Sequence, residues 1–452
     1  MAGWATIDNL YREELKQRRE EGCDVDAFIK THPGVPEDLP TLNRWYDELM
    51  ALPVDPSFPY EEPTAFEQIL AARPAAQPSL PKTDVPFDAF YGAWLGRCIG
   101  CALGKPTECL MGGTEEKASW ELVYEWFRDA GAYPIRGYTP ARSPAAERLG
   151  VEIGCPQSVR ENIAFMESDD DIRYTVLGLK ITEEIGKRFT TRDVIRAWID
   201  ELPFAEVCTA EQQAYINWPF AREMMDMGAS EAEALDYTRT HRNPYREWIG
   251  AQIRVDGFAY SAAGDPELAA DFAYRDASLS HVKNGIYGEM FFGAAIAAAF
   301  VEKDIRRIVD IGLSKIPARC RLAEDVRAAV DVGANAADEF ELIRKVYARW
   351  GHYNPVHTNN NAALCVAALV YAGDDFTKAV GTAVLGGWDT DCNGATVGSL
   401  LGAKLGAENI PDFWKAPLHD TLYSRIFGYH PIPISKCAEK SMEVWKRFRQ
   451  EA

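Results

Sequence analysis

Three acidic segments contain the residues of this sequence best suited to bind a cation or move a proton. Glu108 ends the run Gly-Lys-Pro-Thr-Glu, residues 168–171 read Ser-Asp-Asp-Asp, and residues 389–393 read Asp-Thr-Asp-Cys-Asn. The second and third segments each precede a helical pattern, and the positive end of a helix dipole favours anions there. A helix start also lets neighbouring side chains turn toward one point. These carboxylates are therefore candidates for a shared site.

Each acidic segment also has a simpler interpretation when it is taken alone. An acid at a helix start is a routine N-cap, and a run of three aspartates is usually a solvated cap. The surroundings of the third segment weaken this interpretation, because residues 384–388 and 395–397 are apolar, small or aromatic. Carboxylates without a compensating charge are costly in such surroundings. The third segment is thus the strongest indication of a bound cation.

The charge of the three segments predicts the number and kind of ions. Five carboxylates would meet if the segments converge: Glu108, Asp169, Asp170, Asp389 and Asp391. Two such charges about 4 Å apart repel by about 4 kcal/mol at an effective dielectric constant of about 20. One divalent ion changes the summed charge of −5 to −3, and a second ion changes it to −1. Oxygen ligands select hard cations, so we predict two Mg²⁺ ions, with Mn²⁺ as a substitute.

Two sets of regularly spaced glycines predict the helices that position these acids. Glycines recur every four residues at 92, 96, 100 and 104, and again at 394, 398, 402 and 406. Each glycine inside a helix costs about 1 kcal/mol relative to alanine, so such a series indicates a structural need. At this spacing the glycines share one helix face and let another backbone approach closely. The alternative, a phosphate-binding glycine loop, lacks the usual spacing. We therefore predict two closely packed central helices, each adjoining an acidic segment.

The remaining sequence predicts an all-α fold in two parts. Residues 1–85 form an N-terminal helical extension with a proline-rich linker, in which one short helix spans Phe66–Ala72. Residues 86–452 form the main domain, where long runs rich in alanine and leucine favour helices over strands. Two less regular stretches, near 111–160 and 203–275, are predicted insertions that could cover a cleft.

Composition argues against several classes of function. The chain has 48 basic and 68 acidic residues, a net charge of −20, which argues against binding to nucleic acids or anionic membranes. The longest apolar run, residues 291–301, is too short to span a bilayer, and the N-terminus has no signal core. Ten cysteines are too few for a disulfide scaffold, and the pair Cys98 and Cys101 is predicted to pack in a helix. We expect a cytoplasmic protein with reduced thiols, and no pattern indicates an oligomeric state.

Taken together, these segments resemble the ADP-ribosylglycohydrolase family, which includes the dinitrogenase reductase-activating glycohydrolases. The resemblance spans residues 87–430, and five blocks carry it: residues 90–96, 104–108, 168–171, 279–281 and 386–395. It implies an all-α orthogonal multi-helical bundle with a binuclear magnesium centre in a cleft. It also implies hydrolysis of a glycosidic bond at C1 of a ribose.

The resemblance implies roles for individual acids. The implied metal ligands are Ser168, Asp169, Asp170, Glu108, Asp389 and Asp391. Among them, Asp391 would bridge the two ions. The implied catalytic residues are Glu108, Asp170 and Asp391, and either Glu108 or Asp170 would act as the base toward the attacking water.

Two positions depart from the family pattern. Asp171 stands where the family usually has a threonine, and it could add charge to the site or cap the helix. Cys392 stands where many members place a threonine or serine ligand. A thiol is a poor ligand for magnesium, so Cys392 is a doubtful ligand, and its place would pass to water or to Asn393. The second ion would then be bound more weakly.

Four further residues are predicted to contact the substrate: His281, Trp388, Asn360 and Asn393. His281 lies in a block that resembles a substrate-contacting segment of the family, although a core or capping histidine is the simpler interpretation. Asn360 belongs to a run of three asparagines that is most simply a helix cap. Trp388 directly precedes the third acidic segment and is a candidate for contact with a phosphate or a base.

Three hypotheses for function follow from the resemblance. The first is a magnesium-dependent hydrolase of an ADP-ribosyl conjugate, whose partner is a small molecule or an ADP-ribosylated protein. The second is a glycosidase with the same centre that acts on another nucleoside-like or ribosyl metabolite. The third is a non-catalytic structural or binding protein, as with lens crystallins that resemble the family. Retention of all five carboxylates argues against the third, because a purely structural protein would not require them.

Overall fold

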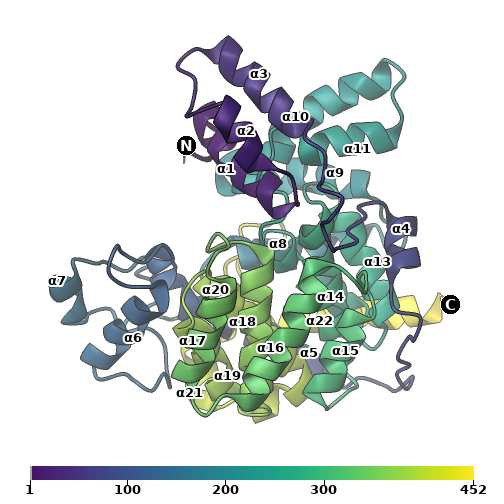
Figure 1. Cartoon of the computed structure of the whole chain (residues 1–452). Coiled ribbons are helices and arrows are strands. Elements are labelled where there is room, and N and C mark those ends of the chain that lie inside the picture. Colours follow the sequence, from purple (N-terminus) through teal and green to yellow (C-terminus); the bar gives the residue numbers. More distant parts are fainter. Residues whose placement is uncertain (1–2, 452) are drawn as a thin grey trace.

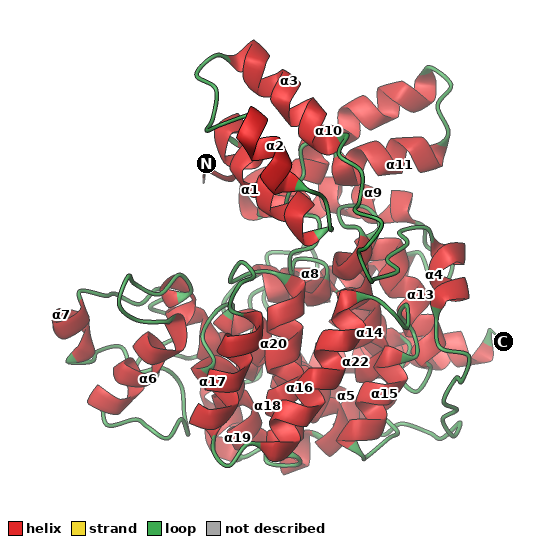
Figure 2. Cartoon of the chain, viewed as in Figure 1, coloured by secondary structure: helices red, strands yellow, loops and turns green. Residues whose placement is uncertain are grey.

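The computed structural model describes residues 3–451, and within them the chain is almost entirely helical (Figure 2). The structure is 63% helical, and the strands in the described residues are one antiparallel pair, β1 (Thr421–Leu422) and β2 (Ile432–Pro433). The predicted all-α class is therefore confirmed. None of the described helices has the length and apolar character needed to cross a bilayer.

The first helices of the chain lie apart from the central bundle in Figure 1. They are the 3-10 helix η1 (Gly3–Ala5), α1 (Ile7–Glu20), α2 (Val25–Thr31) and α3 (Leu39–Met50). Helix α4 (Phe66–Ala72) lies instead beside α13, where the rings of Phe66 and Tyr274 are 4.6 Å apart and Ile69 is buried in the main core. Helix α4 has the bounds predicted from the sequence, because prolines on both sides of it prevent a longer helix.

The rest of the chain forms a long succession of helices. The first half contains α5 (Phe87–Gly104), η2 (Lys105–Leu110), α6 (Ser119–Asp129), α7 (Ala145–Leu149), α8 (Asp170–Glu184), α9 (Thr191–Glu201), η3 (Phe204–Glu206), α10 (Thr209–Asp226), α11 (Glu231–Thr240), η4 (Gln252–Arg254), α12 (Asp256–Ser261) and α13 (Pro266–Ala277). The second half contains α14 (Lys283–Ala299), α15 (Ile305–Leu313), α16 (Arg321–Asn335), α17 (Glu339–Trp350), α18 (Thr358–Ala372), α19 (Phe376–Leu385), α20 (Thr390–Leu405), η5 (Ala407–Asn409), α21 (Asp412–Lys415), η6 (Ala416–Leu418) and α22 (Ile434–Gln450).

Helices α5 and α20 form the centre of the fold and touch through their glycines. A Cβ atom added to Gly100 would lie 1.9 Å from the carbonyl oxygen of Gly394, and one added to Gly104 would lie 2.1 Å from that of Thr390. The two backbones are thus in direct contact, and the predicted pair of closely packed helices is confirmed. The helices are antiparallel, because the end of α5 meets the start of α20. This packing brings the segment that contains Glu108 to the N-terminus of α20.

The other helices surround this pair. Helix α22 packs against α5, helices α18 and α19 pack against α20, and α8 contacts both members of the pair. The two stretches predicted as insertions contain α6 and α7 in one case and α10 to α13 in the other. Figure 1 shows α6 and α7 at one side of the central bundle, and α10 and α11 beside α1 to α3.

The N-terminal helices α1 to α3 have a small apolar core of their own. Leu10, Phe28 and Leu49 are buried in it, and Tyr245 and Trp248 from the main part of the chain complete it. The extension is therefore packed against the segment that follows α11. The division of the chain at residue 85 stays a prediction.

Buried ion pairs also join the extension to the rest of the chain. Arg246 is 2% exposed, and its guanidinium donates hydrogen bonds to both carboxylate oxygens of Glu14 and of Glu21, at 2.7–3.1 Å. Lys283 lies 3.5 Å from Glu21, and Gln17 donates to Glu247 at 2.7 Å. Buried charges need such partners, so α1 is held in place by this network as well as by its apolar face.

We predict that Arg246→Met lowers the free energy of unfolding by about 3–5 kcal/mol, because it leaves the buried carboxylate of Glu14 without a cation and removes one of the three cations beside Glu21. Denaturant unfolding of the purified variant measures this change. The matched control is Arg44→Met, since the side chain of Arg44 is 62% exposed and lies 3.7 Å from Glu48. The control should change the free energy by less than about 1 kcal/mol. Equal effects of the two substitutions would contradict the prediction.

Candidate metal centre

Three helix ends bring the predicted carboxylates together. Four groups of side chains among the described residues each place three ligand atoms within 4.8 Å of one another. These groups are Glu108, Asp389 and Asp391; Asp169, Asp170 and Asp171; Cys101, Asp169 and Asp391; and Asp171, Asp391 and Cys392. Asp391 belongs to three of the four groups, so it lies at the centre of the cluster. The five carboxylates predicted from the sequence thus converge, and their role as ligands stays a prediction.

The capping interpretation applies to Asp169 in the second acidic segment and not to Asp389 in the third. Asp169 is the N-cap of α8, and its carboxylate accepts a hydrogen bond from the backbone N–H of Asp171 at 3.0 Å. Asp389 occupies the N-cap position of α20, but its side chain makes no capping hydrogen bond. The carboxylate of Asp389 therefore does not cap the N-terminus of α20.

A tight turn sets the direction in which α20 begins. Gly387 and Trp388 both have positive φ angles, 70° and 57°, and such a conformation is strained for tryptophan. The backbone N–H of Trp388 donates to the Ser119 hydroxyl at 3.1 Å, and its ring stacks on Tyr347 with 4.3 Å between centroids. These contacts hold the turn, and the turn presents Asp389 to the cluster.

The two acids of α20 have oxygen atoms that the protein leaves without partners. Asp389 is 5% exposed and Asp391 is 2% exposed. The Oδ1 atom of each is buried and has no hydrogen-bond partner among the described residues. A buried carboxylate oxygen without a partner is costly. These oxygens, together with the oxygen-rich ligand groups, fit a hard divalent cation.

Two buried cations of the protein itself neutralise part of the cluster. The ammonium of Lys105 lies 3.1 Å from Asp169 Oδ2 and donates to the backbone oxygen of Ser168 at 2.7 Å. The guanidinium of Arg97 lies 2.6 Å from Asp171, so the aspartate that replaces the usual threonine is one half of an ion pair. With Lys105 included, two divalent ions bring the charge of the five carboxylates to −5 + 1 + 4 = 0.

Sequence reasoning missed Lys105 and Arg97, although both carried a signal. Arg97 stands in the middle of an apolar, glycine-containing helical run, where a charged side chain needs a buried partner. Lys105 stands between Gly104 and Pro106, three residues before Glu108. The partners of both cations lie more than 60 residues further along the chain, so spacing alone could not identify them.

Charge crowding raises most of the carboxylate pKa values. Burial and the charge of Asp169 raise the pKa of Asp170 to about 7 and that of Asp391 to about 6. The charge of Asp391, followed by burial, raises the pKa of Glu108 well above its usual value. Burial also acts to raise the pKa of Asp169, but the ammonium of Lys105 reverses the direction, and the pKa is lowered. In the metal-free protein the cluster therefore holds protons near neutral pH.

The raised pKa values predict how stability depends on pH without metal. A raised pKa means that the folded protein binds the proton more tightly than the unfolded chain, whose carboxylates titrate near about 4. The contribution to stability is fully present below about pH 4 and is lost as pH rises through the folded pKa values. For Asp391 and Asp170 this loss extends to about pH 6 and about pH 7.

A divalent metal ion should reverse the dependence of stability on pH, because the cation binds the deprotonated carboxylates. We predict that the apparent affinity for Mg²⁺ rises about tenfold or more between about pH 6 and about pH 8, as Asp170 and Asp391 lose their protons. The stabilisation by Mg²⁺ in thermal unfolding should grow over the same range. A metal-induced shift in Tm that is the same at both pH values would contradict this prediction.

The remaining predicted ligands have partners within the protein. The Cys392 thiol is buried and donates to Asp171 Oδ2 at 3.1 Å. Burial and the charge of Asp171 raise its pKa well above the usual value, so it stays a neutral thiol in the metal-free protein. Ser168 is half-buried, and its hydroxyl accepts a hydrogen bond from Arg173 at 3.0 Å. Both residues adjoin the cluster without belonging to an all-carboxylate group.

The four predicted substrate contacts lie in the interior, outside the four ligand groups. His281 is fully buried, with Nδ1 2.8 Å from the Ser280 hydroxyl, and Asn393 donates to the side chain of Asn361 at 2.8 Å. Asn360 is also fully buried and donates to a backbone oxygen, and the Trp388 ring lies on Tyr347. A role for these four residues in substrate binding stays a prediction.

Three members of the acidic segments keep some exposure to solvent. Glu108, Ser168 and Asp170 are half-buried, whereas Asp169, Asp389 and Asp391 are buried. Arg173 lies beside Ser168, because it donates to the Ser168 hydroxyl, and it also pairs with Glu206 at 3.3 Å. Sequence reasoning did not single out Arg173, which stands one helical turn after Asp169.

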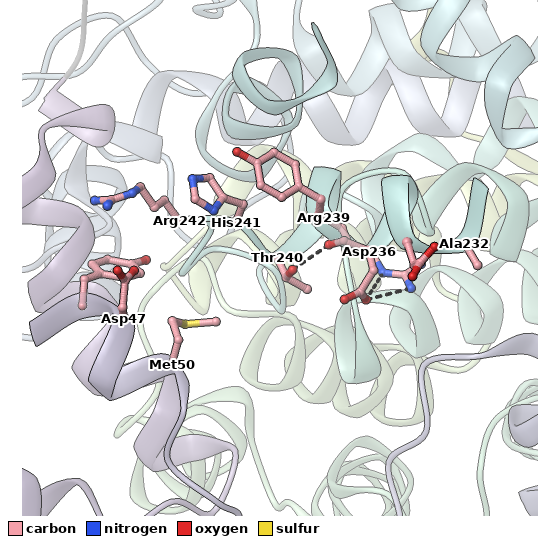
Figure 3. A pocket seen from close by; sticks show the side chains of 11 residues that line it. Asp47, Met50, Ala232, Asp236, Arg239, Thr240, His241 and Arg242 are labelled. Carbon is pink, nitrogen blue, oxygen red and sulfur yellow. Dashed lines mark hydrogen bonds and ion pairs between the residues drawn. The ribbon is translucent and has the colours of Figure 1, made fainter. Parts of the chain in front are cut away.

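A separate pocket of about 630 Å³ lies between α3 and α11 (Figure 3). Its lining includes Asp47, Asp236, Arg239 and His241, and none of its lining residues belongs to the acidic cluster. The carboxylate of Asp236 is paired with Arg239 at 3.1 Å within the same helix. The pocket is a space between two helical hairpins, and the acidic cluster has the stronger chemical case for a functional site.

The fold and the cluster define an all-α protein in which buried carboxylates that could hold a metal ion meet where three helix ends come together. The chain belongs to the ADP-ribosylglycohydrolase family, whose model matches residues 82–443. Membership supports a glycohydrolase activity in general, and the family is typically metal-dependent. The predicted resemblance and the predicted fold of the family are confirmed.

Comparisons with solved structures and with curated proteins add less information about this chain than the family model does. One similar solved structure is an ADP-ribosylglycohydrolase-related protein complex, which is 18% identical and has a TM-score of 0.49. The match covers 80% of this chain and 98% of that chain. No curated protein matches the chain significantly.

Proposed function

We propose that this protein is a magnesium-dependent hydrolase that cleaves the glycosidic bond at C1 of the ribose in an ADP-ribosyl conjugate. The observation that carries the proposal is the pair of buried, unpartnered oxygens on Asp389 and Asp391, which share a ligand group with Glu108. Membership of the family supports the reaction class, since its members are glycohydrolases.

The chain offers ligands for two divalent ions. Glu108, Asp389 and Asp391 would hold one ion, and Asp169 would help to hold the other, since it shares one ligand group with Asp170 and another with Asp391. The charge balance with Lys105 supports two ions rather than one. Magnesium fits a site of carboxylate oxygens, and Mn²⁺ is the expected substitute. Bound ions would supply Lewis acidity and fixed positions for the ribose hydroxyls.

The half-buried residues of the cluster would handle the proton and the substrate. Asp170 is half-buried and would accept the proton of the attacking water. Glu108 is the alternative base. The carboxylates would also stabilise the positive charge that develops on the ribose as the bond to C1 breaks. Arg173, whose guanidinium donates to the Ser168 hydroxyl beside the cluster, would bind a phosphate of the substrate.

The direct experiment is to measure release of ADP-ribose from a mono-ADP-ribosylated arginine peptide and from a small ADP-ribose conjugate. We expect release with Mg²⁺, none after the protein is stripped of metal, and recovery when Mg²⁺ or Mn²⁺ is restored. Asp170→Asn should lower the rate by about 10²-fold or more, as expected for a general base. The exposed residue Asp200, whose side chain is 64% exposed, provides the control Asp200→Asn, which should be unchanged. A metal-independent rate would contradict the proposal.

A second candidate is a glycosidase with the same centre that acts on a different ribosyl or nucleoside-like metabolite. The observation that favours it is the full burial of His281, whose block resembles a substrate-contacting segment of the family. The backbone oxygen of Arg246 accepts a hydrogen bond from Val282 at 3.0 Å, so the chain after α11 covers this block. Turnover of ribosyl metabolites without release of ADP-ribose from any conjugate would select this candidate.

A further inference from the structure

Two buried thiols flank the central aspartate of the cluster. The sulfur of Cys101 lies within 4.8 Å of carboxylate oxygens of Asp169 and Asp391. The sulfur of Cys392 lies within the same limit of carboxylate oxygens of Asp171 and Asp391. We propose that Cys101, with Asp169 and Asp391, makes this centre a binding site for thiophilic divalent cations such as Cd²⁺ or Zn²⁺. The proposal rests on the metal centre proposed above and adds a sulfur ligand to it.

The thiol of Cys101 lies beside the cluster and is available to bind a cation. It stands three residues before Gly104, on the helix whose glycines touch α20, and its side chain is fully buried. Its sulfur makes no hydrogen bond within the described part of the chain. The Oδ1 atom of Asp391 is also buried and without a hydrogen-bond partner. A sulfur without a hydrogen bond therefore lies within 4.8 Å of an oxygen of Asp391, a carboxylate that has an unpartnered buried oxygen.

Cys392 is the less available sulfur. Its thiol donates to Asp171, and Arg97 holds the carboxylate of Asp171 in a buried ion pair at 2.6 Å. Binding a cation through Cys392 would break this hydrogen bond, whereas binding through Cys101 would break none. Cys101 is therefore the principal sulfur ligand of the proposed site.

The mixed donor set determines which cations would bind. A thiolate selects soft or borderline ions, and Mg²⁺ gains nothing from it. Binding of Cd²⁺ forms a bond between the metal and the Cys101 sulfur, and the thiol proton passes to the buffer. Because Asp169 and Asp391 are ligands in both cases, the thiophilic ion and Mg²⁺ should exclude each other. Trace Zn²⁺ or Cd²⁺ would then inhibit the magnesium-dependent reaction.

The test is a titration with Cd²⁺ that follows the ultraviolet charge-transfer band between thiolate sulfur and cadmium. The three cysteines that are not buried, Cys109, Cys155 and Cys208, are first replaced by serine to remove competing surface thiols. In this background we compare Cys101→Ser with Cys98→Ser. Cys98 lies on the same helix and is also fully buried, but it belongs to none of the ligand groups, so it is a matched control.

We expect one Cys101-dependent Cd²⁺ per chain, with release of a proton. Cys101→Ser should remove the band and weaken Cd²⁺ binding by about tenfold or more, while Cys98→Ser leaves both unchanged. Cys101→Ala is the second variant if the serine variant does not fold, and thermal unfolding checks both. A band that survives in Cys101→Ser and in Cys101→Ala would overturn the proposal. Absence of the band in the parent protein would overturn it as well.

The magnesium assay separates this inference from the proposed function. Magnesium-dependent hydrolysis without a Cys101-dependent band would overturn the thiol site and leave the function standing. A Cys101-dependent band in a protein that neither binds Mg²⁺ nor hydrolyses an ADP-ribosyl conjugate would support the thiol site and overturn the function. Competition between Mg²⁺ and Cd²⁺ would support both.

Discussion

The substitution Asp391→Asn is expected to abolish hydrolysis and weaken divalent-cation binding while the helical fold persists. Asp391 belongs to three of the four ligand groups, and the substitution replaces its anionic carboxylate by a neutral amide in each of them. We expect kcat/KM to fall by about a thousandfold or more, since several kcal/mol of Lewis-acid stabilisation would be lost. The metal-free variant should be no less stable than the metal-free parent, because a buried, crowded charge is removed.

Metal titration and thermal unfolding of the same variant separate these effects. Added Mg²⁺ should raise the Tm of the parent protein and leave that of Asp391→Asn nearly unchanged. Asp412, whose side chain is 94% exposed on α21, provides the control Asp412→Asn, which should behave as the parent does. Near-normal turnover by Asp391→Asn would remove the metal centre from the account.

A large effect on folding is also expected from Gly100→Ala. The new Cβ atom would lie 1.9 Å from the backbone oxygen of Gly394, and no side-chain rotamer can relieve a clash with backbone. Helices α5 and α20 would have to separate along their whole contact. We expect the free energy of unfolding to fall by about 3 kcal/mol or more, despite the higher helix propensity of alanine.

Denaturant unfolding measures this loss, and Mg²⁺ binding provides a second readout. The ends of α5 and α20 hold the two halves of the cluster, so separating the helices should weaken metal binding as well. Gly112→Ala is the matched control, because a Cβ atom there would meet nothing within 4 Å. A Gly100→Ala protein as stable as this control would show that the two backbones are not in contact.

The central helices and the acids they carry could be predicted because their signals are local or regular. The glycine spacing identified the contact between α5 and α20, and the flanking prolines fixed the bounds of Phe66–Ala72. The convergence of the acids was expected because two acidic segments stand at helix starts and the third follows the first glycine helix. Each of these features depends on residues that are close together in the sequence, so a single sequence is enough to recognise it.

Features that depend on packing between distant segments could not be predicted. Arg246 pairs with Glu14 and Glu21 across more than 220 residues, and the sequence gives no sign of that match. The burial of His281 depends on how the chain after α11 folds over it. Lys105 and Arg97 were visible as isolated charges, but their partners follow only from the approach of α8.

The measurement that tests the central claim most directly is calorimetric titration of Mg²⁺ into metal-stripped protein, with and without ADP-ribose. The account predicts two binding events, both tightened by ADP-ribose, because the ions and the ribose hydroxyls would share the site around Asp391. Absence of any binding heat, together with an unchanged Tm, would contradict it. The carboxylates would then be helix caps and buried pairs in a non-catalytic helical protein.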